Sequence, residues 1–461
     1  MTYQMANRLP VSNEHAVSPA HIEKTPLRIL FLTTYFKPDI TANGILMTQL
    51  AEELSAIGHH VTVVTSMPHY STNRIWDEYR GKFWQREKQN GLDIHRVYLY
   101  VPSEKTNLVG RLLNYLSFNL FSLIVALWVG RHDVVFVPSP PLTNGLTGYL
   151  VKLIHRCKYV YNVQDIYPDV AVRLGMLTNP RAIKFFEKVE SFVYQGADSV
   201  SVISQGFWKN LRDKKVPAKK LALIPNFVDA DFIRPQPRHN AFSRKEGLDD
   251  RFVLLFAGNV GLSQALDKVL DAAYLLQDLP EILFLLVGNG SSKEILIAKA
   301  QKMDLQNVRF LPFQSHEDVP NMYASADACL VPLKRGLAQE SVPSKAFSIL
   351  GAGKPLIASV DSENDMLTLL KEANSGIVVE PENPEALAEV IRVLYHDRSQ
   401  LIEMGMNGRR YIEAYCTKQV IAREYETLFQ QVVNRSPSNK TENMPDPLSD
   451  NQQIIDAKTT I

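Results

Sequence analysis

The sequence predicts an α/β protein made of two doubly wound, parallel-sheet domains. Three observations support this fold class. Short apolar runs alternate with helical segments in two separate series along the chain. A polar, proline-containing segment separates the two series. The length of 461 residues is more than one domain usually needs.

The first series begins at Leu27, where "LRILFLTTY" has the continuous apolar pattern of a strand buried on both faces. A loop, a helical segment that ends at Gly58 and the strand "VTVVTS" follow, which together make one βαβ unit. We therefore expect an N-terminal Rossmann-like domain over residues 27–226. Its further strands are expected at 94–100, 133–139, 158–165 and 199–204.

The second series follows the linker segment "LIPNFVDADFIRPQPRHN". It predicts a C-terminal Rossmann-like domain over residues 227–412, followed by a helix at 413–435 that packs back toward the first domain. The polar tails, 1–26 and 436–461, are expected to be disordered. Strands of the second domain are expected at 252–260, 282–290, 308–313, 328–333, 355–359 and 376–380.

Composition narrows the class of function. The formal net charge of +1 gives no global basic field, so nucleic acid is not an expected partner. Cys157, Cys329 and Cys416 are far apart and lack CxxC or Cys/His spacing, which indicates neither a disulfide framework nor a zinc site. The first residues lack the pattern of a secretory signal. We therefore expect a cytoplasmic protein.

Residues 112–130 form an apolar segment about long enough to span a bilayer. Two interpretations stay open: a largely buried helix that leads into the next strand, or a helix lying against a membrane. The preceding stretch, 74–111, is rich in Arg and Lys with aromatic residues between them. It is either an ordinary solvated face or a surface for anionic headgroups. Any membrane contact is thus expected within 74–130, on the inner face of the cytoplasmic membrane.

The loop "YFKPDITANG" joins the first strand to the start of a helix. In open α/β sheets ligands bind beyond the carboxyl ends of the strands. Backbone N–H groups at a helix N-terminus favour a phosphate there. Gly44 would let the backbone approach such a ligand closely, although a glycine in this turn also has an ordinary steric explanation.

Five blocks then point to a family. The order and spacing of these blocks resemble the retaining glycosyltransferases of family four, in particular the branch of colanic-acid and O-antigen enzymes that make cell-surface polysaccharides. The resemblance extends from about Leu27 to Tyr415 and implies the GT-B fold, in which two Rossmann-like domains face each other across a cleft. The blocks are "KPDITANGILMTQLAEELSAIGHHVTVVTS", "NVQDIYPD", "VISQGFWKNL" followed by "IPNFVD", "FAGNVGLSQALDKVLDAA" and "ESVPSKAFSILGAGKPLIAS".

The resemblance implies roles for single residues. Gly44 would face the diphosphate of a nucleotide-sugar donor, and Asp165 would face the reacting sugar. Glu340 matches the first acid of the Glu-x7-Glu element of the family and would contact the donor sugar. Asp165 and Glu340 are therefore the expected catalytic residues.

The remaining donor contacts are expected in the C-terminal domain. By the resemblance, Gly258 and Asn259 would lie under the diphosphate, and the loop with Phe313 and Gln314 would meet the base. No metal is expected, because helix N-termini and basic side chains can stabilise a leaving diphosphate. The "DAD" at 229–231 imitates a metal-binding motif but lies in the linker. No other cofactor is expected, since the nucleotide sugar is a substrate.

The sequence also departs from the family pattern. The second acid of the Glu-x7-Glu element falls at Ser348, which cannot hold a ribose diol as a carboxylate does. Asn259 and Gln264 stand where many members carry an Arg and a Lys. Phosphate charge must then be met elsewhere, and Lys345 and Lys334 are the nearest candidates. Lys345 is otherwise an ordinary surface lysine.

The expected function is transfer of a sugar, a hexose by the family pattern, with retention and without a metal. The donor would be a nucleotide sugar, and the acceptor a glycan or a polyprenyl-diphosphate-linked sugar in cell-surface polysaccharide synthesis. Two alternatives stay open. A nucleotide-sugar epimerase shares the plan of two Rossmann-like domains, and a catalytically silent nucleotide-binding scaffold would explain the departures. A dehydrogenase is disfavoured, because the first turn lacks G-x-G-x-x-G.

Overall fold

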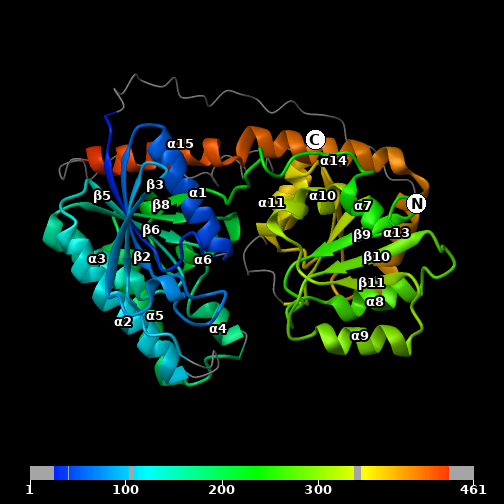
Figure 1. Ribbon diagram of the computed structural model, residues 1–461, viewed down its shortest axis with the longest axis horizontal. Coiled ribbons are helices and arrows are strands. Elements are labelled where there is room, and N and C mark those ends of the chain that lie inside the picture. Colours follow the sequence, from blue (N-terminus) through cyan, green and yellow to red (C-terminus); the bar gives the residue numbers. More distant parts are fainter. Residues whose placement is uncertain (1–24, 40, 103–107, 174, 337–343, 436–461) are drawn as a thin grey trace, which may run out of the picture.

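The chain folds into two α/β domains that lie side by side (Figure 1). The structure is a computed structural model that describes residues 25–39, 41–102, 108–173, 175–336 and 344–435. The N-domain holds an eight-stranded sheet of order β3-β4-β2-β1-β5-β6-β7-β8, and the C-domain a six-stranded sheet of order β11-β10-β9-β12-β13-β14. All pairs are parallel except β3–β4. The predicted fold class is confirmed.

The strands of the N-domain sheet alternate with helices on both of its faces. Its strands are β1 (Arg28–Leu32), β2 (His60–Ser66), β3 (Trp84–Gln89), β4 (Leu92–Val97), β5 (Val134–Pro138), β6 (Lys158–Val163), β7 (Ser199–Val202) and β8 (Leu221–Leu223). Its helices are α1 (Ala42–Ala56), α2 (Leu108–Trp128), α3 (Asn144–His155), α4 (Asp169–Arg173), α5 (Pro180–Gly196) and α6 (Gln205–Asp213), with 3-10 turns at Asp77–Tyr79 and Ala218–Lys220.

The C-domain repeats this plan with six strands. They are β9 (Phe252–Ala257), β10 (Ile282–Val287), β11 (Val308–Leu311), β12 (Ala328–Pro332), β13 (Leu356–Ser359) and β14 (Gly376–Val379). The helices are α7 (Ala241–Lys245), α8 (Leu266–Tyr274), α9 (Lys293–Lys302), α10 (Val319–Ala324), α11 (Ser344–Gly351), α12 (Asp365–Ala373), α13 (Pro384–His396) and α14 (Arg398–Tyr415), with a 3-10 turn at His316–Asp318.

The central strands are buried on both faces, as their apolar sequences require. In β1 every residue after Arg28 is buried, and the strand pairs with β2 on one side and β5 on the other. One face of the N-domain sheet packs on α2, α3, α5 and α6, and the opposite face packs on α1 and α15 (Lys418–Asn434). Because these strands are parallel, their carboxyl ends meet at one edge of the sheet, where the loops that carry the candidate residues begin.

The edge strand of the N-domain sheet was not predicted from the sequence, which indicated only its neighbour at 94–100. Residues 84–97 form the antiparallel hairpin β3–β4, whose turn residues Asn90 and Gly91 both have positive φ. An Asn-Gly pair between two strands is a hairpin signal. Arg86 pairs with Asp93 and Arg96 with Glu87 across the hairpin. Part of the basic stretch 74–111 is therefore neutralised inside the sheet and is not a single docking surface.

Helix α2 covers most of the apolar segment 112–130. It packs on α3, β2 and β4 and is long and apolar enough to cross a membrane by length and composition, yet only 33% of that span is buried. The expectation of a largely buried helix is therefore wrong. Its inner face holds Phe118, Val125 and Ala126, and its outer face is apolar and exposed. The alternative of a helix against a membrane stays open.

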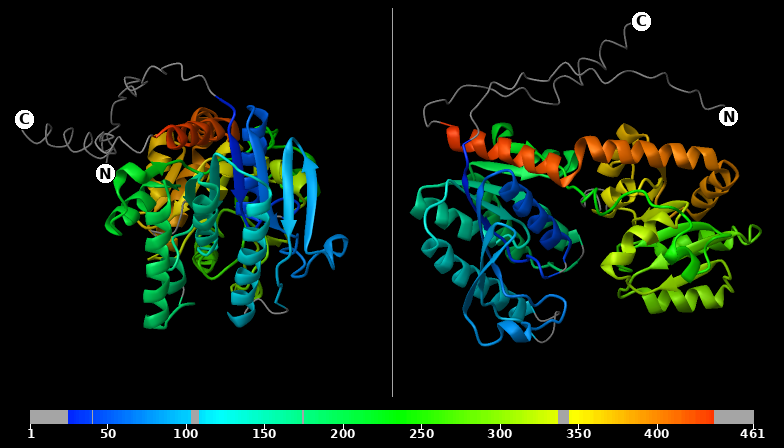
Figure 2. Two further views of the ribbon diagram at one scale, coloured as in Figure 1. Left: turned by 90° about the vertical axis from the view of Figure 1, so that its left-hand side faces the viewer. Right: turned by 45° about the horizontal axis from the view of Figure 1, so that its top comes forward.

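The chain crosses between the domains at two adjacent points. Val228 donates its backbone N–H to Cys416 and forms a bridge with Thr417. Beyond this crossing, α15 returns to the N-domain, where the Phe429 ring lies 5.5 Å from that of Phe136. Figures 1 and 2 show α14 and α15 running along the same side of both domains. The last helix thus belongs to the core of the first domain.

Candidate functional site

The first candidate element is the loop between β1 and α1. Thr41 caps α1, because its hydroxyl accepts the Gly44 backbone N–H at 2.9 Å. A Cβ on Gly44 would lie 2.8 Å from the Thr41 hydroxyl and 3.3 Å from Tyr35 Cβ. Gly44 is therefore required by packing within the loop itself. Its predicted contact with a diphosphate stays a prediction.

Asn43, beside Gly44, was not singled out from the sequence. Its side-chain amide donates to the Ser139 carbonyl at 3.2 Å, which joins the first loop to the loop after β5. Its Oδ1 atom is buried and accepts no hydrogen bond within the described residues. A buried acceptor without a partner costs free energy unless a ligand satisfies it. Asn43 is therefore a further candidate contact for a substrate hydroxyl.

Asp165 lies in the loop after β6, with its side chain half-buried. The Ser139 hydroxyl fixes this loop, since it accepts the backbone N–H of Gln164 at 3.0 Å and that of Asp165 at 3.4 Å. Gln164 in turn bonds to Asn162 and Asn226. The structure thus brings the Gly44 and Asp165 loops together at the carboxyl edge of the N-domain sheet, with Ser139 between them.

The matching element of the C-domain lies at the end of β9. Gly258 has a φ of +146° and Gly288, at the end of β10, a φ of +144°. A Cβ on Gly288 would lie 1.9 Å from the Gly258 carbonyl oxygen, so no side chain fits between the two strands there. Asn259 follows with an exposed side chain. Gly258 itself is partly exposed, and on its α-carbon side it faces the Lys345 side chain.

Lys345, on the first turn of α11, supplies a cation beside Gly258. Its ammonium lies 3.3 Å from the position of a Cβ on Gly258, 4.3 Å from the centre of the Phe256 ring and 3.2 Å from Gln264 Oε1. Burial lowers the pKa of Lys345 to about 8. None of the ion pairs within the described part of the chain includes Lys345. This is a charge that an anionic ligand would satisfy.

The other donor-site candidates lie on α11 and after β11. Ser348 lies one turn after Lys345 on α11 and is half-buried. Phe313 is 58% exposed after β11, and the Gln314 side chain donates to the Pro312 carbonyl at 2.9 Å. Glu340 lies outside the described residues. These donor-site assignments remain predictions.

The acidic linker residues have structural partners. Asp229 of the "DAD" segment accepts from the Lys418 ammonium at 2.8 Å, and Asp231 is 3.4 Å from the Gln419 amide. Within the described ranges, no group of three or more His, Cys, Asp or Glu side chains could hold a metal ion. The segment therefore fastens the start of α15 to the linker.

Two family models cover most of the chain. A model described as glycosyl transferase 4-like domain matches residues 44–226, and one described as glycosyl transferases group 1 matches residues 239–411. The chain is 28% identical over 411 residues to WcaI of Escherichia coli K12, described as a colanic acid biosynthesis glycosyl transferase, which corresponds to 87% of this chain and 98% of WcaI. The chain belongs to the glycosyltransferases. The family resemblance of the sequence blocks is confirmed.

Solved structures agree on the fold of this glycosyltransferase. Sucrose-phosphate synthase from Thermosynechococcus elongatus matches with a TM-score of 0.66 at 20% identity, over 89% of this chain and 100% of that one. Anabaena HepE in complex with UDP and glucose matches with a TM-score of 0.66 at 16% identity, over 88% of this chain and 99% of that one. The GT-B architecture predicted from the sequence is thus confirmed.

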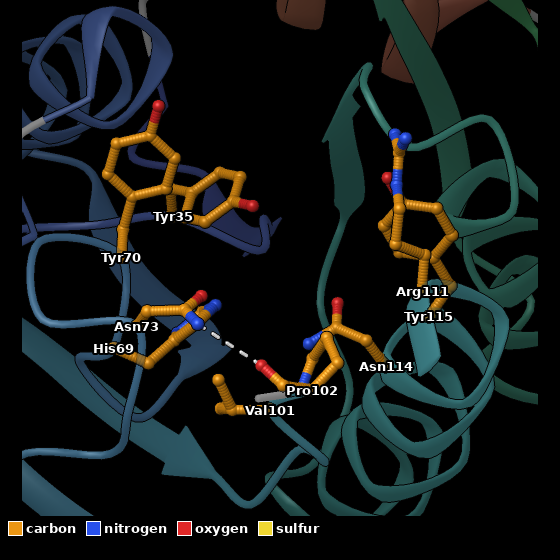
Figure 3. A pocket seen from close by; sticks show the side chains of 9 residues that line it. All are labelled: Tyr35, His69, Tyr70, Asn73, Val101, Pro102, Arg111, Asn114 and Tyr115. Carbon is orange, nitrogen blue, oxygen red and sulfur yellow. Dashed lines mark hydrogen bonds between the residues drawn. The ribbon is translucent and has the colours of Figure 1, made fainter. Parts of the chain in front are cut away.

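The glycosyltransferase also has a cavity that the sequence analysis did not predict. It has a volume of about 300 Å³ and lies in the N-domain, beyond the carboxyl ends of β1, β2 and β4 (Figure 3). Tyr35 lies in the first loop, where the sequence suggested no role for it, and nothing in the local sequence linked it to α2. The residues that line the cavity are Tyr35, His69, Tyr70, Asn73, Val101, Pro102, Arg111, Asn114 and Tyr115.

Proposed function

We propose that this glycosyltransferase moves a sugar, with retention and without a metal, from a nucleoside-diphosphate sugar to a lipid-linked glycan acceptor. The process would be cell-surface polysaccharide synthesis at the inner face of the cytoplasmic membrane. The similarity to WcaI supports the pathway class, and the HepE complex with UDP supports the donor class. The observation that carries the proposal is the Lys345 ammonium beside Gly258.

A diphosphate fits the site beside Lys345 and Gly258 for electrostatic reasons. Lys345 is a half-buried cation that lacks a carboxylate partner within the described residues, and it lies beside the partly exposed Gly258. Charge-assisted hydrogen bonds to phosphate are about twice as strong as neutral ones. A cation held in place before the reaction stabilises the charge that develops on the leaving diphosphate. Lys345 would therefore supply the charge that Asn259 and Gln264 cannot.

The reaction would then need no covalent intermediate. The bond between the anomeric carbon and the diphosphate oxygen breaks while the acceptor oxygen bonds to that carbon on the same face. The acceptor proton passes to the departing phosphate oxygen, so that the step balances. Asp165 would orient the sugar or stabilise its positive character, and Glu340 would hold the sugar hydroxyls. Closure of the domains would exclude water that could hydrolyse the donor.

The lipid-linked acceptor is supported by an apolar surface, the α2–α3–α5 face. Helix α2 contacts α3, and α3 contacts α5, on the side of the sheet away from α1. No charged residue occurs between Leu112 and Gly130. Large exposed patches of this kind mark contact sites for membranes or proteins. The exposed apolar side chains of the face are Val109, Leu112, Leu113, Leu116, Leu120, Ile124, Trp128, Leu150, Leu153, Ile154, Phe185 and Phe192.

The charges around this face favour an anionic bilayer as its partner. Arg181, Lys184 and Lys188 are exposed on α5, where Glu187 is the exposed acid, and Arg156 is exposed after α3. Basic side chains around an apolar helix face add electrostatic attraction to anionic lipids. The membrane contact would therefore lie on α2, α3 and α5, with residues 74–100 as a smaller part of it.

A ligand screen tests the donor half of the proposal. We expect one of UDP, GDP, ADP or CMP, or its sugar conjugate, to raise the unfolding midpoint of the full chain, with the same shift in EDTA. A ligand at one hundred times its Kd stabilises the folded state by about 2.7 kcal/mol. Absence of any shift would contradict the transferase and favour a silent scaffold that binds nucleotide weakly or not at all.

Two further measurements test the reaction. Incubation with the donor alone should leave its sugar unchanged, whereas an epimerase would convert it. With a lipid-linked acceptor, NMR of the product should show the anomeric configuration of the donor. An inverted product would contradict retention.

A further inference from the structure

The cavity between the first loop and α2 contains an arginine, Arg111. Within the described residues, no Asp or Glu lines this cavity and Arg111 takes part in no ion pair. The nearby carboxylate of Asp39 is 2% exposed and accepts the backbone N–H groups of His69 and Tyr70, at 2.9 and 3.0 Å. It is thus occupied in fixing the loop after β2.

Tyrosines form the two walls of the cavity. Figure 3 shows Tyr35 and Tyr70 on one side and Arg111 with Tyr115 on the other. The Tyr35 ring packs at 5.4 Å against that of Tyr70. Within the described residues, the hydroxyls of Tyr35 and Tyr115 have no hydrogen-bond partner. Desolvation raises the pKa of Tyr35 above its ordinary value, so its hydroxyl stays protonated and can donate.

The size and position of the cavity suit a saccharide next to the reacting centre. Its volume of about 300 Å³ is at the lower end of the usual range for small-ligand sites. Tyr35 Cβ lies 3.3 Å from the position of a Cβ on Gly44. Arg111 and Tyr115 also act electrostatically on Tyr167, two residues after Asp165. The cavity therefore adjoins the first loop, and its Arg111 and Tyr115 are within electrostatic range of the Asp165 loop.

The cavity also borders the α2–α3–α5 face. Arg111 and Tyr115 are one turn apart on α2 and so share one side of the helix. Leu112 and Leu116, the residues that follow them, are each 52% exposed on the apolar face. A ligand held by Arg111 could therefore continue toward a bilayer that contacts α2.

We propose that this cavity binds an oxyanion carried by the acceptor, with Arg111 as its cation and the hydroxyls of Tyr35 and Tyr115 as further donors. The oxyanion is either the carboxylate of an acidic sugar or the diphosphate of a lipid carrier. Arginine suits both, because its planar guanidinium forms paired hydrogen bonds with carboxylate and phosphate. This inference rests on the proposed transferase function, in which the C-domain takes the donor.

Binding of small probes to the full chain tests the inference by ligand-observed NMR. The probes are methyl glucuronide, methyl glucoside and inorganic pyrophosphate. The variants are Arg111→Gln, Arg111→Lys and Lys345→Gln. If the oxyanion is a carboxylate, the wild type should bind the glucuronide at least about tenfold more tightly than the glucoside, as one charge-assisted contact allows. That preference should disappear in Arg111→Gln and be partly kept in Arg111→Lys.

If the oxyanion is a diphosphate, pyrophosphate should show a site that survives Lys345→Gln and is lost in Arg111→Gln. The inference is overturned if Arg111→Gln changes the binding of neither anion. As a control, nucleoside-diphosphate binding and the unfolding midpoint should be the same in Arg111→Gln and the wild type. This result would show that the variant is folded. Failure of the wild type to bind any nucleoside diphosphate would instead contradict the proposed function. Tyr115→Phe, which keeps the ring, should weaken the same probe as Arg111→Gln, by a smaller factor.

Discussion

Both carboxylate oxygens of Asp365 lie 2.9 Å from the backbone nitrogen of Gly206. Asp365 begins α12 in the C-domain, and Gly206 lies in the first turn of α6 in the N-domain. The contact thus ties the two domains through the positive end of α6. A Cβ on Gly206 would lie 2.6 Å from Asp365 Oδ2, so the approach depends on glycine.

Removing the contact between Asp365 and Gly206 should reduce the stability of the two-domain arrangement. We expect Asp365→Ala to lower the free energy of unfolding by about 1–3 kcal/mol, the usual cost of losing a hydrogen bond to a charged group. Urea unfolding measures this change in the free energy of unfolding. Glu363→Ala, which removes an exposed acid just before α12, is the matched control and should change little. Equal effects of the two substitutions would argue against a specific tie.

Lys345→Gln should weaken the binding of the nucleoside diphosphate that stabilises the wild type. The loss of one charge-assisted contact predicts a Kd that is about 10- to 100-fold higher. Calorimetric titration checks this, with Lys302→Gln, an exposed lysine at the end of α9, as the control. An unchanged Kd would remove Lys345 from the donor site.

The same lysine should make donor binding depend on pH. Burial lowers the pKa of Lys345 to about 8 in the free protein, and a bound diphosphate would raise it by favouring the charged form. Binding is then tightest below pH 8, where the ammonium is already charged. Above pH 8 the affinity should fall by up to about tenfold per pH unit, because binding must take up a proton. Lys345→Gln should remove this decline, and its persistence in the variant would assign it to another group.

Asp165→Asn should impair the reaction more than donor binding. Loss of a charge that stabilises the transition state predicts that kcat falls to about one hundredth of the wild-type value or below. The Kd of the nucleotide should stay nearly unchanged. Asp169→Asn is the control within the same block. Asp169 accepts from the Lys214 ammonium at 2.7 Å and from Asn210 at 3.2 Å, so its substitution should reduce stability and spare kcat. Full activity of Asp165→Asn would contradict its catalytic role.

Charges on the α2–α3–α5 face should weaken membrane binding. Leu120→Glu combined with Ile124→Glu should lower the partition onto phosphatidylglycerol vesicles at least about tenfold, since each buried aliphatic side chain contributes about 1.5–3 kcal/mol. Sedimentation with vesicles measures this partition. Ile402→Glu places the same charge on a 70% exposed isoleucine of the C-domain and should have no effect. Equal vesicle binding by all the variants would exclude this face as the contact.

The sequence by itself determined the two alternating series, the two parallel sheets and the family. These follow from local patterns: an apolar run such as residues 27–35 is a buried strand wherever its neighbours lie. The hairpin at 84–97 was also encoded locally, by Asn90 and Gly91, although only its second strand was expected. Strand order carries no such local signal, because it depends on which crossovers pack together.

Only the tertiary structure decided how the sites are assembled. The order β4-β2-β1 places Tyr35, Tyr70 and Arg111, which follow three different strands, around one cavity. The packing of α11 against the end of β9 brings Lys345 next to Gly258. Composition could not show which side of α2 is buried, since both sides are apolar, and only the sheet beneath it decides that. Proximity between distant residues is a property of the packed fold, and a periodic pattern in one segment cannot specify it.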